Sequence, residues 1–316
     1  MNVPTPARNA GGGFSARLDA VASEIDDLLD DLLSEKRLEG ELARPARLLE
    51  AMRYATLGGG KRLRPFLLVE CANLFNVPRQ GSLLAGAALE CVHCYSLVHD
   101  DLPTMDNDDL RRGQPTTHKA FDEATAILAG DALLTFAFDL LSSDDVHPSA
   151  DVRLQLVREL ARASGLGGMV GGQMLDLAAE GRFDAKAPKP NEAAVTTLQA
   201  MKTGALIRFA CRAGAILAEA DADALGALDR FGRAIGQAYQ VADDLLDIYG
   251  DPNVMGKAAG KDAAAGKATL AGMLGREGAQ ARLDTLLRDA DEALGRFGDK
   301  AGSLRAATRF IAERKA

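Results

Sequence analysis

Tryptophan is absent from this 316-residue chain, and aromatic residues of all kinds make up only 5% of it. Runs in which Val, Ile or Thr alternate with polar residues are also missing, which argues against β-strands. Apolar residues instead recur at spacings of three and four, as on one face of a helix. With 47% hydrophobic residues the chain can bury a large core. We therefore expect an all-α fold, built as one large helical domain without a linker.

Excess positive charge is lacking as well. The formal net charge is −8 and the isoelectric point is near 5.2, which argues against nucleic acid or an anionic membrane surface as a general partner. Any phosphate chemistry must then depend on local basic groups or on metal ions. The apolar stretch ALIRFACRAGAILA carries Arg208 and Arg212, so we expect no stable membrane insertion from it.

Cysteine is scarce, with four scattered residues, and the first residues lack the apolar core of an export signal. Both features favour a reducing, cytoplasmic setting. Cys91 and Cys94 form CVHC, but a zinc site needs about four nitrogen or sulfur ligands and no second pair follows at a suitable spacing. At the N-terminus, the Pro- and Gly-rich residues 1–14 are expected to be disordered, and Ser15 to cap the first helix.

Carboxylates, by contrast, are clustered. Five aspartates stand between residues 100 and 109, and Arg111 and Arg112 follow directly. A second cluster, DDLLD at Asp243–Asp247, has outer aspartates one helical turn apart. Like charges this close need a compensating cation, and oxygen-only ligands suit Mg²⁺, which bridges carboxylates to substrate phosphates. Two such clusters facing each other would hold a diphosphate through several metal ions.

Other polar runs have simpler interpretations. In DDLLDDLL at Asp26–Leu33 the aspartates alternate with leucines, and no basic or glycine partner lies near in the sequence, so a solvated helix face is predicted. SSDD at Ser142–Asp145 is typical of a polar turn. The glycine-rich turn LGGGKRLRP at Leu57–Pro65 exposes backbone N–H groups, and its arginines favour bidentate phosphate contacts. A basic turn taken alone is more often solvated than functional.

Five motifs follow one another in the order GGGKRLRP, DDLPTMDNDDLRRG, GMVGGQMLD, MKTG and QVADDLLDIYGD. This set resembles the trans-isoprenyl diphosphate synthases, or polyprenyl synthetases, and especially their bacterial members that make farnesyl diphosphate. The resemblance implies a polyprenyl synthetase domain over residues 15–316, folded as a helical bundle around a deep central cavity. It also implies a homodimer. After Lys267 this chain reads Ala268-Thr269-Leu270-Ala271, where the family usually continues with Ser/Thr-Thr-Tyr-Pro.

The implied activity is that of a prenyltransferase. It would condense isopentenyl diphosphate with dimethylallyl or geranyl diphosphate, head to tail through an allylic cation, to give farnesyl diphosphate and diphosphate. Water would trap such a cation, so the cavity must be apolar and closed. Loss of the diphosphate would depend on three Mg²⁺ ions and on cationic side chains that neutralise it.

The resemblance further assigns residues to roles. Those implied to bind or support Mg²⁺ are Asp100, Asp101, Asp106, Asp176, Asp243, Asp244 and Asp247. Those implied to contact the allylic diphosphate or lie beside its reacting carbons are Arg111, Lys202, Lys257, Thr203 and Gln240. Those implied to bind isopentenyl diphosphate are Lys61, Arg64, His93 and Arg112. Lys267 is implied to close over diphosphate from a mobile loop at Asp251–Lys267.

Product length should depend on Tyr95 and Ser96, which lie five and four residues before Asp100. At ~1.5 Å per residue, Tyr95 falls about 7 Å from the metal site along the helix, where a bulky ring blocks further growth. This favours a C15 over a C20 product. The alternatives are a geranylgeranyl diphosphate synthase, a class I terpene cyclase and a non-catalytic subunit of a heteromeric synthase. The Asp-rich second motif and the intact basic turn argue against the cyclase, and two complete clusters argue against the subunit.

Overall fold

Helices make up nearly all the regular structure in the computed structural model, which describes residues 10–184, 186, 188–249 and 269–313. The all-α fold class is thereby confirmed. The elements in chain order are α1 (Ala10–Leu32), α2 (Ala46–Leu57), α3 (Leu63–Asn73), α4 (Arg79–Asp100), β1 (Leu110–Arg111), β2 (Gln114–Pro115), α5 (Thr117–Ala120), α6 (Glu123–Ser142), α7 (Ala150–Ser164), α8 (Met169–Ala179), α9 (Glu192–Gln199), the π-helical turn η1 (Ala200–Gly204), α10 (Ala205–Leu217), α11 (Ala222–Tyr249), α14 (Leu270–Ala293), the 3₁₀ helix η2 (Gly295–Ala301) and α15 (Gly302–Glu313).

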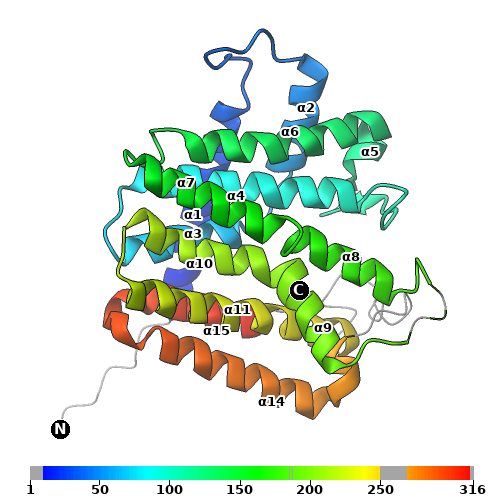
Figure 1. The fold of residues 1–316 in the computed structure, drawn as a ribbon, viewed down its shortest axis with the longest axis vertical. Helices are drawn as coiled ribbons and strands as arrows, with labels where there is room; N and C mark the ends of the chain where they lie inside the picture. Colours follow the sequence, from blue (N-terminus) through cyan, green and yellow to red (C-terminus); the bar gives the residue numbers. More distant parts are fainter. Residues whose placement is uncertain (1–9, 185, 187, 250–268, 314–316) are drawn as a thin grey trace.

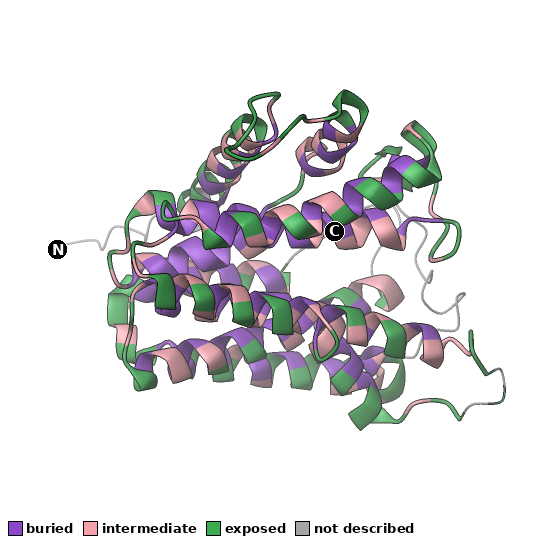
Figure 2. Cartoon of the chain, turned by 45° about the horizontal axis from the view of Figure 1, so that its top comes forward, coloured by how far each residue is buried: buried purple, intermediate pink, exposed green. Residues whose placement is uncertain are grey.

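The long helices form a bundle in which α6, α4, α3, α10, α11 and α14 are successive neighbours (Figure 1). The inner helices are buried along most of their length, whereas α6, α7 and α14 each show an exposed face (Figure 2). The core is filled mainly by leucine, alanine and a few phenylalanines, including Phe66, Phe209 and Phe231. The many alanines allow the helices to pack close together. The cavity described below lies between such closely packed helices.

The first helix begins at Ala10, so Ser15 lies inside it and the expectation that Ser15 caps this helix is wrong. Residues 10–14, expected to be disordered, are part of α1. Phe14 explains the difference, because its ring packs at centroid distances of 5.5 Å against Phe66 and 5.3 Å against Phe310. Residues 1–9 lie outside the described residues.

Two local features depart from the expected run of helices. The apolar spacing of residues 117–142 predicts one helix, but the structure has two, because the chain breaks at Asp122, whose side chain accepts a hydrogen bond from Thr125 N and caps α6. Ahead of them, β1 and β2 pair as a two-residue antiparallel hairpin. Its turn residues, Arg112 and Gly113, both have positive φ angles of 54° and 78°, as a tight hairpin turn requires.

By length and composition alone, α4 and α6 could each cross a membrane. In α4, however, 78% of the apolar window is buried inside the bundle, so its composition is that of a core helix. The corresponding share in α6 is 44%, and Ile127 and Leu128 on that helix are exposed. The outer face of α6 is therefore more apolar than the internal packing of one chain requires.

The close contact between α3 and α10 depends on Gly214, where an added Cβ would lie 2.5 Å from Ala72 N. We expect Gly214→Ala to lower the unfolding free energy by about 2 kcal/mol or more, because overpacking must push two core helices apart. Gly226→Ala is the matched control. Its Cβ would meet nothing closer than 3.7 Å, so this change in the interior of α11 should raise stability by about 0.5–1 kcal/mol. Urea unfolding checks both, and equal effects would contradict the packing argument.

Candidate active site

A cavity of about 460 Å³ opens beside the C-terminal end of α4. Side chains from α3, α4, α6, α8 and η1 form its wall, together with the loop after α4. Those used below are Arg64, His93, Tyr95, Ser96, His99, Asp100, Ile127, Gln173, Lys202 and Thr203. The structure thus brings together residues that are up to 139 positions apart in the sequence, counting from Arg64 to Thr203.

Asp100 is the last residue of α4 and lies in the cavity wall. The chain then bends back, and Asp106 N donates a 2.8 Å hydrogen bond to Asp100 O. Burial raises the pKa of Asp100 to about 6; the positive charge of Lys202 opposes this shift and the negative charge of Asp106 adds to it. These two carboxylates therefore form an electronegative pair that a cation would stabilise.

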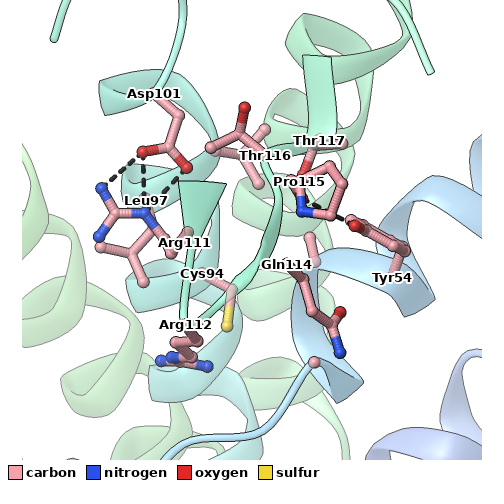
Figure 3. A pocket seen from close by; sticks show the side chains of 13 residues that line it. Tyr54, Cys94, Leu97, Asp101, Arg111, Arg112, Gln114, Pro115, Thr116 and Thr117 are labelled. Atoms are coloured by element: carbon pink, nitrogen blue, oxygen red, sulfur yellow. Dashed lines mark hydrogen bonds and ion pairs between the residues drawn. The ribbon is translucent and has the colours of Figure 1, made fainter. Parts of the chain in front are cut away.

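Asp101 has different surroundings, although it follows directly in the sequence. Its buried carboxylate accepts hydrogen bonds from Arg111, with both Nε–oxygen distances at 2.8 Å (Figure 3). Burial raises the pKa of Asp101, against the hydrogen bonds from Arg111. Figure 3 also shows a contact on the second strand of the hairpin, where Tyr54 OH donates a 2.7 Å hydrogen bond to Pro115 O. Asp101 thus anchors Arg111 and the hairpin, and both its oxygens are engaged by that arginine.

Lys202 projects from η1, the wide π-helical turn that joins α9 to α10. Helix α8 crosses this turn closely, because a Cβ on Gly172 would lie 2.2 Å from Lys202 N. On the same helix Asp176 accepts from Lys202 Nζ at 2.5 Å. The glycine therefore allows the approach and the carboxylate holds the ammonium group at the cavity edge. A π-turn at a functional position is a recurring feature of helices.

A chain of hydrogen bonds links Thr203 to the second acidic cluster. Thr203 Oγ1 donates to Gln240 Oε1, and Gln240 Nε2 donates to Asp244 Oδ1, each at 3.0 Å. Asp244 is buried, and its other oxygen accepts from Gln199 Nε2 and Leu270 N, also at 3.0 Å. This carboxylate is saturated by protein donors and fixes the amide of Gln240 beside Thr203.

The other members of the second cluster face differently. Asp243 is exposed on α11, and Asp247 is half-buried one turn later. Asp243 is therefore accessible to solvent, whereas its neighbour Asp244 is buried. Lys257 and Lys267, the loop Asp251–Lys267 and Ala268 lie outside the described residues. The chain is described again from Thr269, whose side chain accepts from Gly272 N and caps α14.

Of the basic residues assigned to isopentenyl diphosphate, Arg64 and His93 line the cavity, while Lys61 and Arg112 lie at the glycine turn before α3. Arg64 Nη1 lies 3.3 Å from His93 Nε2, and Arg64 Nε is buried without a hydrogen-bond partner in the described part of the chain. Burial, helped by the positive charge of Arg64, lowers the pKa of His93 well below its usual value. His93 is thus a neutral ring that can accept from the guanidinium. Arg112 donates to Gly59 O in the glycine turn, and Lys61 Nζ lies 5.3 Å from the centre of the Phe310 ring.

The donor set fits a hard divalent cation. Asp100 contributes carboxylate oxygens to the cavity wall, and the negative charge of Asp106 lies close enough to add to its raised pKa; hard divalent cations prefer such oxygens. No three carboxylate, imidazole or thiol side chains converge into a closed ligand set among the residues that the structure describes. Such an open arrangement suits Mg²⁺, which keeps several waters and shares its coordination with substrate phosphates.

Gln173 is a cavity residue to which the sequence reasoning assigned no role. Neither atom of its side-chain amide has a hydrogen-bond partner in the described structure, although both are buried. An unpaired buried amide is unfavourable, so its polar atoms are available to a bound molecule or to water. A signal was present, because Gln173 precedes Asp176 by three positions and three residues along a helix share one face.

The predicted floor residues do lie in the wall of the cavity. Tyr95 is buried, and its ring packs edge-on against His99 with the centroids 5.7 Å apart. Burial, with the negative charge of Asp100, raises the pKa of Tyr95 to about 12, so the phenol is neutral. Ser96 turns back on its own helix and donates to His93 O at 2.8 Å. Tyr95 and Ser96 thus both line the cavity, and Tyr95 presents the larger side chain.

Comparison with known proteins agrees with this geometry. A family model described as polyprenyl synthetase matches residues 45–299. The farnesyl diphosphate synthase of Escherichia coli (strain K12) is 45% identical over 95% of this chain and 99% of that protein. The chloroplastic geranylgeranyl pyrophosphate synthase of Catharanthus roseus is 37% identical over 95% of this chain and 81% of that protein. An apo crystal structure of an FPP/GFPP synthase from Zymomonas mobilis has a TM-score of 0.84 at 45% identity and covers 95% of this chain and 99% of that chain. The chain belongs to the polyprenyl synthetase family.

Proposed function

We propose that this chain is a farnesyl diphosphate synthase, a prenyltransferase that joins isopentenyl diphosphate to dimethylallyl and then geranyl diphosphate. The carrying observation is that one cavity is lined by Asp100 and Lys202, by a neutral His93 and an Arg64 whose Nε has no partner among the described residues, and by the ring of Tyr95. The similarity to farnesyl diphosphate synthases supports the same product. The polyprenyl synthetase domain would extend over residues 15–316, somewhat beyond the matched 45–299.

The two substrates would occupy the two walls. The allylic diphosphate would lie against Lys202 and Arg111, which Asp176 and Asp101 hold in place. Isopentenyl diphosphate would lie against Lys61, Arg64, His93 and Arg112. Each diphosphate then meets cations that are already oriented, so little reorganisation is needed when the C–O bond breaks. Lys257 and Lys267 would add further positive charge.

The family uses magnesium, and three ions would bind here. Asp100 and Asp106 would be ligands from the first cluster, and Asp243, supported by Asp247, from the second. The ions would neutralise the departing diphosphate. Asp101, Asp176 and Asp244 would contribute by holding Arg111, Lys202 and Gln240. The hydroxyl of Thr203 and the amide of Gln240 would orient their oxygens towards the allylic carbons. The double bond of isopentenyl diphosphate would attack the cation, and a proton would pass to the released diphosphate.

Two alternative functions would use the same fold. A C20 synthase would make a longer product, and a non-catalytic subunit would make none.

Product analysis tests this proposal. Incubation with Mg²⁺, isopentenyl diphosphate and dimethylallyl diphosphate, followed by dephosphorylation, should give farnesol as the main alcohol, and excess EDTA should abolish it. Asp100→Asn should lower kcat roughly 10²- to 10³-fold, as loss of one electrostatic contact at a reacting centre typically does. The matched control is Asp144→Asn, which changes an exposed aspartate whose ion-pair partner is Arg153. If no alcohol longer than C5 forms with the unsubstituted protein, the non-catalytic subunit becomes the better interpretation.

Product length should follow from the ring of Tyr95. Tyr95→Ala opens the wall next to His99, so chains should grow to C20 or beyond, with geranylgeraniol or longer alcohols as the main products. Tyr95→Phe keeps the ring and should keep farnesol as the main product. Chromatography of the dephosphorylated products separates these cases. A Tyr95→Ala variant that still stops at C15 would show that another side chain limits growth.

The homodimer expected from the resemblance has a surface that supports it. A groove of about 640 Å³ lies between α2 and α6, and its apolar lining includes Leu48, Met52, Leu128 and Phe136. Leu128 is 58% exposed, which is high for leucine on a helix with so apolar a composition. We propose a second copy of this chain as the partner on this face, because an apolar surface of this kind is stabilised when a like surface covers it.

Light scattering should give twice the 33.3 kDa mass of one chain. Leu128→Glu should halve this mass, because burying an unpaired charge in the interface would destabilise the dimer by about 2–5 kcal/mol. The control is Met273→Glu on α14, on the far side of the bundle from α6 (Figure 1). A dimer that survives Leu128→Glu would place the interface elsewhere.

A further inference from the structure

The basic turn that precedes α3 is held in an unusual backbone conformation. Gly59 and Gly60 have φ angles of 89° and 136°, and Arg62, which is not a glycine, has φ 46° and ψ 37°. Arg62 is also the N-cap residue of α3 and offers it no side-chain hydrogen bond. A left-handed conformation costs about 1 kcal/mol or more for a residue with a side chain. Something else must therefore hold Arg62 in place.

The contacts of its side chain supply that restraint. Arg62 is fully buried, and its guanidinium reaches three helices at once. Nη1 donates to Glu90 Oε1 on α4 at 2.8 Å, and Nε donates to Asp26 Oδ1 on α1 at 2.8 Å. Nη2 donates to Thr56 O near the end of α2. All three nitrogens are used, so the direction of the side chain, and with it the backbone, is overdetermined.

The residues around Arg62 are those assigned above to isopentenyl diphosphate. Lys61 precedes it directly, and Arg64 follows two residues later. Arg112 packs over the same turn, since a Cβ on Gly60 would lie 2.9 Å from Arg112 Cζ. Glu90, which accepts from Arg62, lies three positions before His93 on the same helix and therefore on the same side of it. The buried guanidinium of Arg62 thus connects the basic turn before α3 to the part of α4 that carries His93.

We infer that Arg62, held between Asp26 and Glu90, is a positioning residue that fixes the geometry of the isopentenyl diphosphate subsite. It cannot touch the substrate, because its side chain has no exposed surface. It acts instead by holding Lys61 and Arg64 where two oxyanions of one diphosphate can meet them. The inference rests on the proposed function and adds to it a specific task for Asp26, on a helix face that the sequence pattern marked as solvated.

Asp26 is the residue that tests this without breaking the core. Its side chain is 40% exposed, so Asp26→Asn leaves no buried unpaired carboxylate, while Arg62 keeps Glu90 and Thr56 O. The matched control is Asp30→Asn, one turn later on α1, because Asp30 pairs with the partly exposed Arg53 on α2. Both changes remove one aspartate charge from the same helix, and only one of them loosens Arg62.

Steady-state kinetics and calorimetric titration with isopentenyl diphosphate are the readouts. Asp26→Asn should raise the KM and Kd for isopentenyl diphosphate about three- to tenfold, as expected when a contact is loosened but the fold is kept. The KM for geranyl diphosphate and the urea midpoint should match those of Asp30→Asn. Arg62→Lys should weaken isopentenyl diphosphate binding further, since one ammonium cannot donate in three fixed directions. If Arg62→Lys does not fold, the Asp26→Asn comparison still decides.

Two results would overturn the inference alone, in a protein that makes farnesyl diphosphate. One is equal affinity for isopentenyl diphosphate in Asp26→Asn and Asp30→Asn. The other is a loss that falls equally on both substrates and follows the urea midpoint, as a purely structural ion pair would produce. An unsubstituted protein that neither turns over nor binds isopentenyl diphosphate would instead overturn the proposed function, and this inference with it.

Discussion

The structure depends on an accumulation of like charge at the C-terminal end of α4. Asp100 and Asp101 end a helix whose last carbonyls already carry partial negative charge, so two carboxylates there are unfavourable on their own. Arg111 pairs with Asp101, whereas Asp100 lies beside Asp106 and is offset by the charges of Lys202 and, more weakly, Arg111. Burial is the main cause of the raised pKa of Asp100, and the charges of Asp106 and Asp101 add to it. A site with uncompensated negative charge at a cavity mouth is prepared for a cation and, through it, for a diphosphate.

Close approach of helices places the opposing positive charge. At Gly172 helix α8 meets η1, and at Gly236 helix α11 meets the same turn, where an added Cβ would lie 3.1 Å from Gly204 Cα. Side chains at either glycine would push the turn outward and carry Lys202 and Thr203 away from Asp100. Asp176 and Gln240 then orient the two side chains that the backbone has brought near. Close helix packing thus sets how far Lys202 and Thr203 lie from Asp100, and the hydrogen bonds set the orientation of their side chains.

The helical periodicity predicted an all-α fold, because the apolar faces of the helices are decided locally and then buried. It could not predict η1, since a π-turn at Ala200–Gly204 results from contact with α8 and has no signal of its own. The resemblance to the polyprenyl synthetases implied roles for Tyr95, Asp100, Lys202 and Thr203, and the structure places all four in the wall of one cavity. It could not distinguish a carboxylate that faces the cavity from one that holds an arginine. Burial and partners make that distinction, and both are tertiary.

The five letters DDLLD occur twice in this chain, at Asp26–Asp30 and at Asp243–Asp247, and show why sequence pattern alone stops short. In the first copy Asp26 reaches the buried Arg62 and Asp30 reaches Arg53, so a face read as solvated contributes to the core. In the second copy Asp244 is buried against amides and a helix N-terminus while Asp243 is exposed. Both segments are amphipathic helices with the same local chemistry. What differs is whether a guanidinium or an amide lies opposite, and that depends on residues 36 positions from Asp26 in one case and 45 positions from Asp244 in the other.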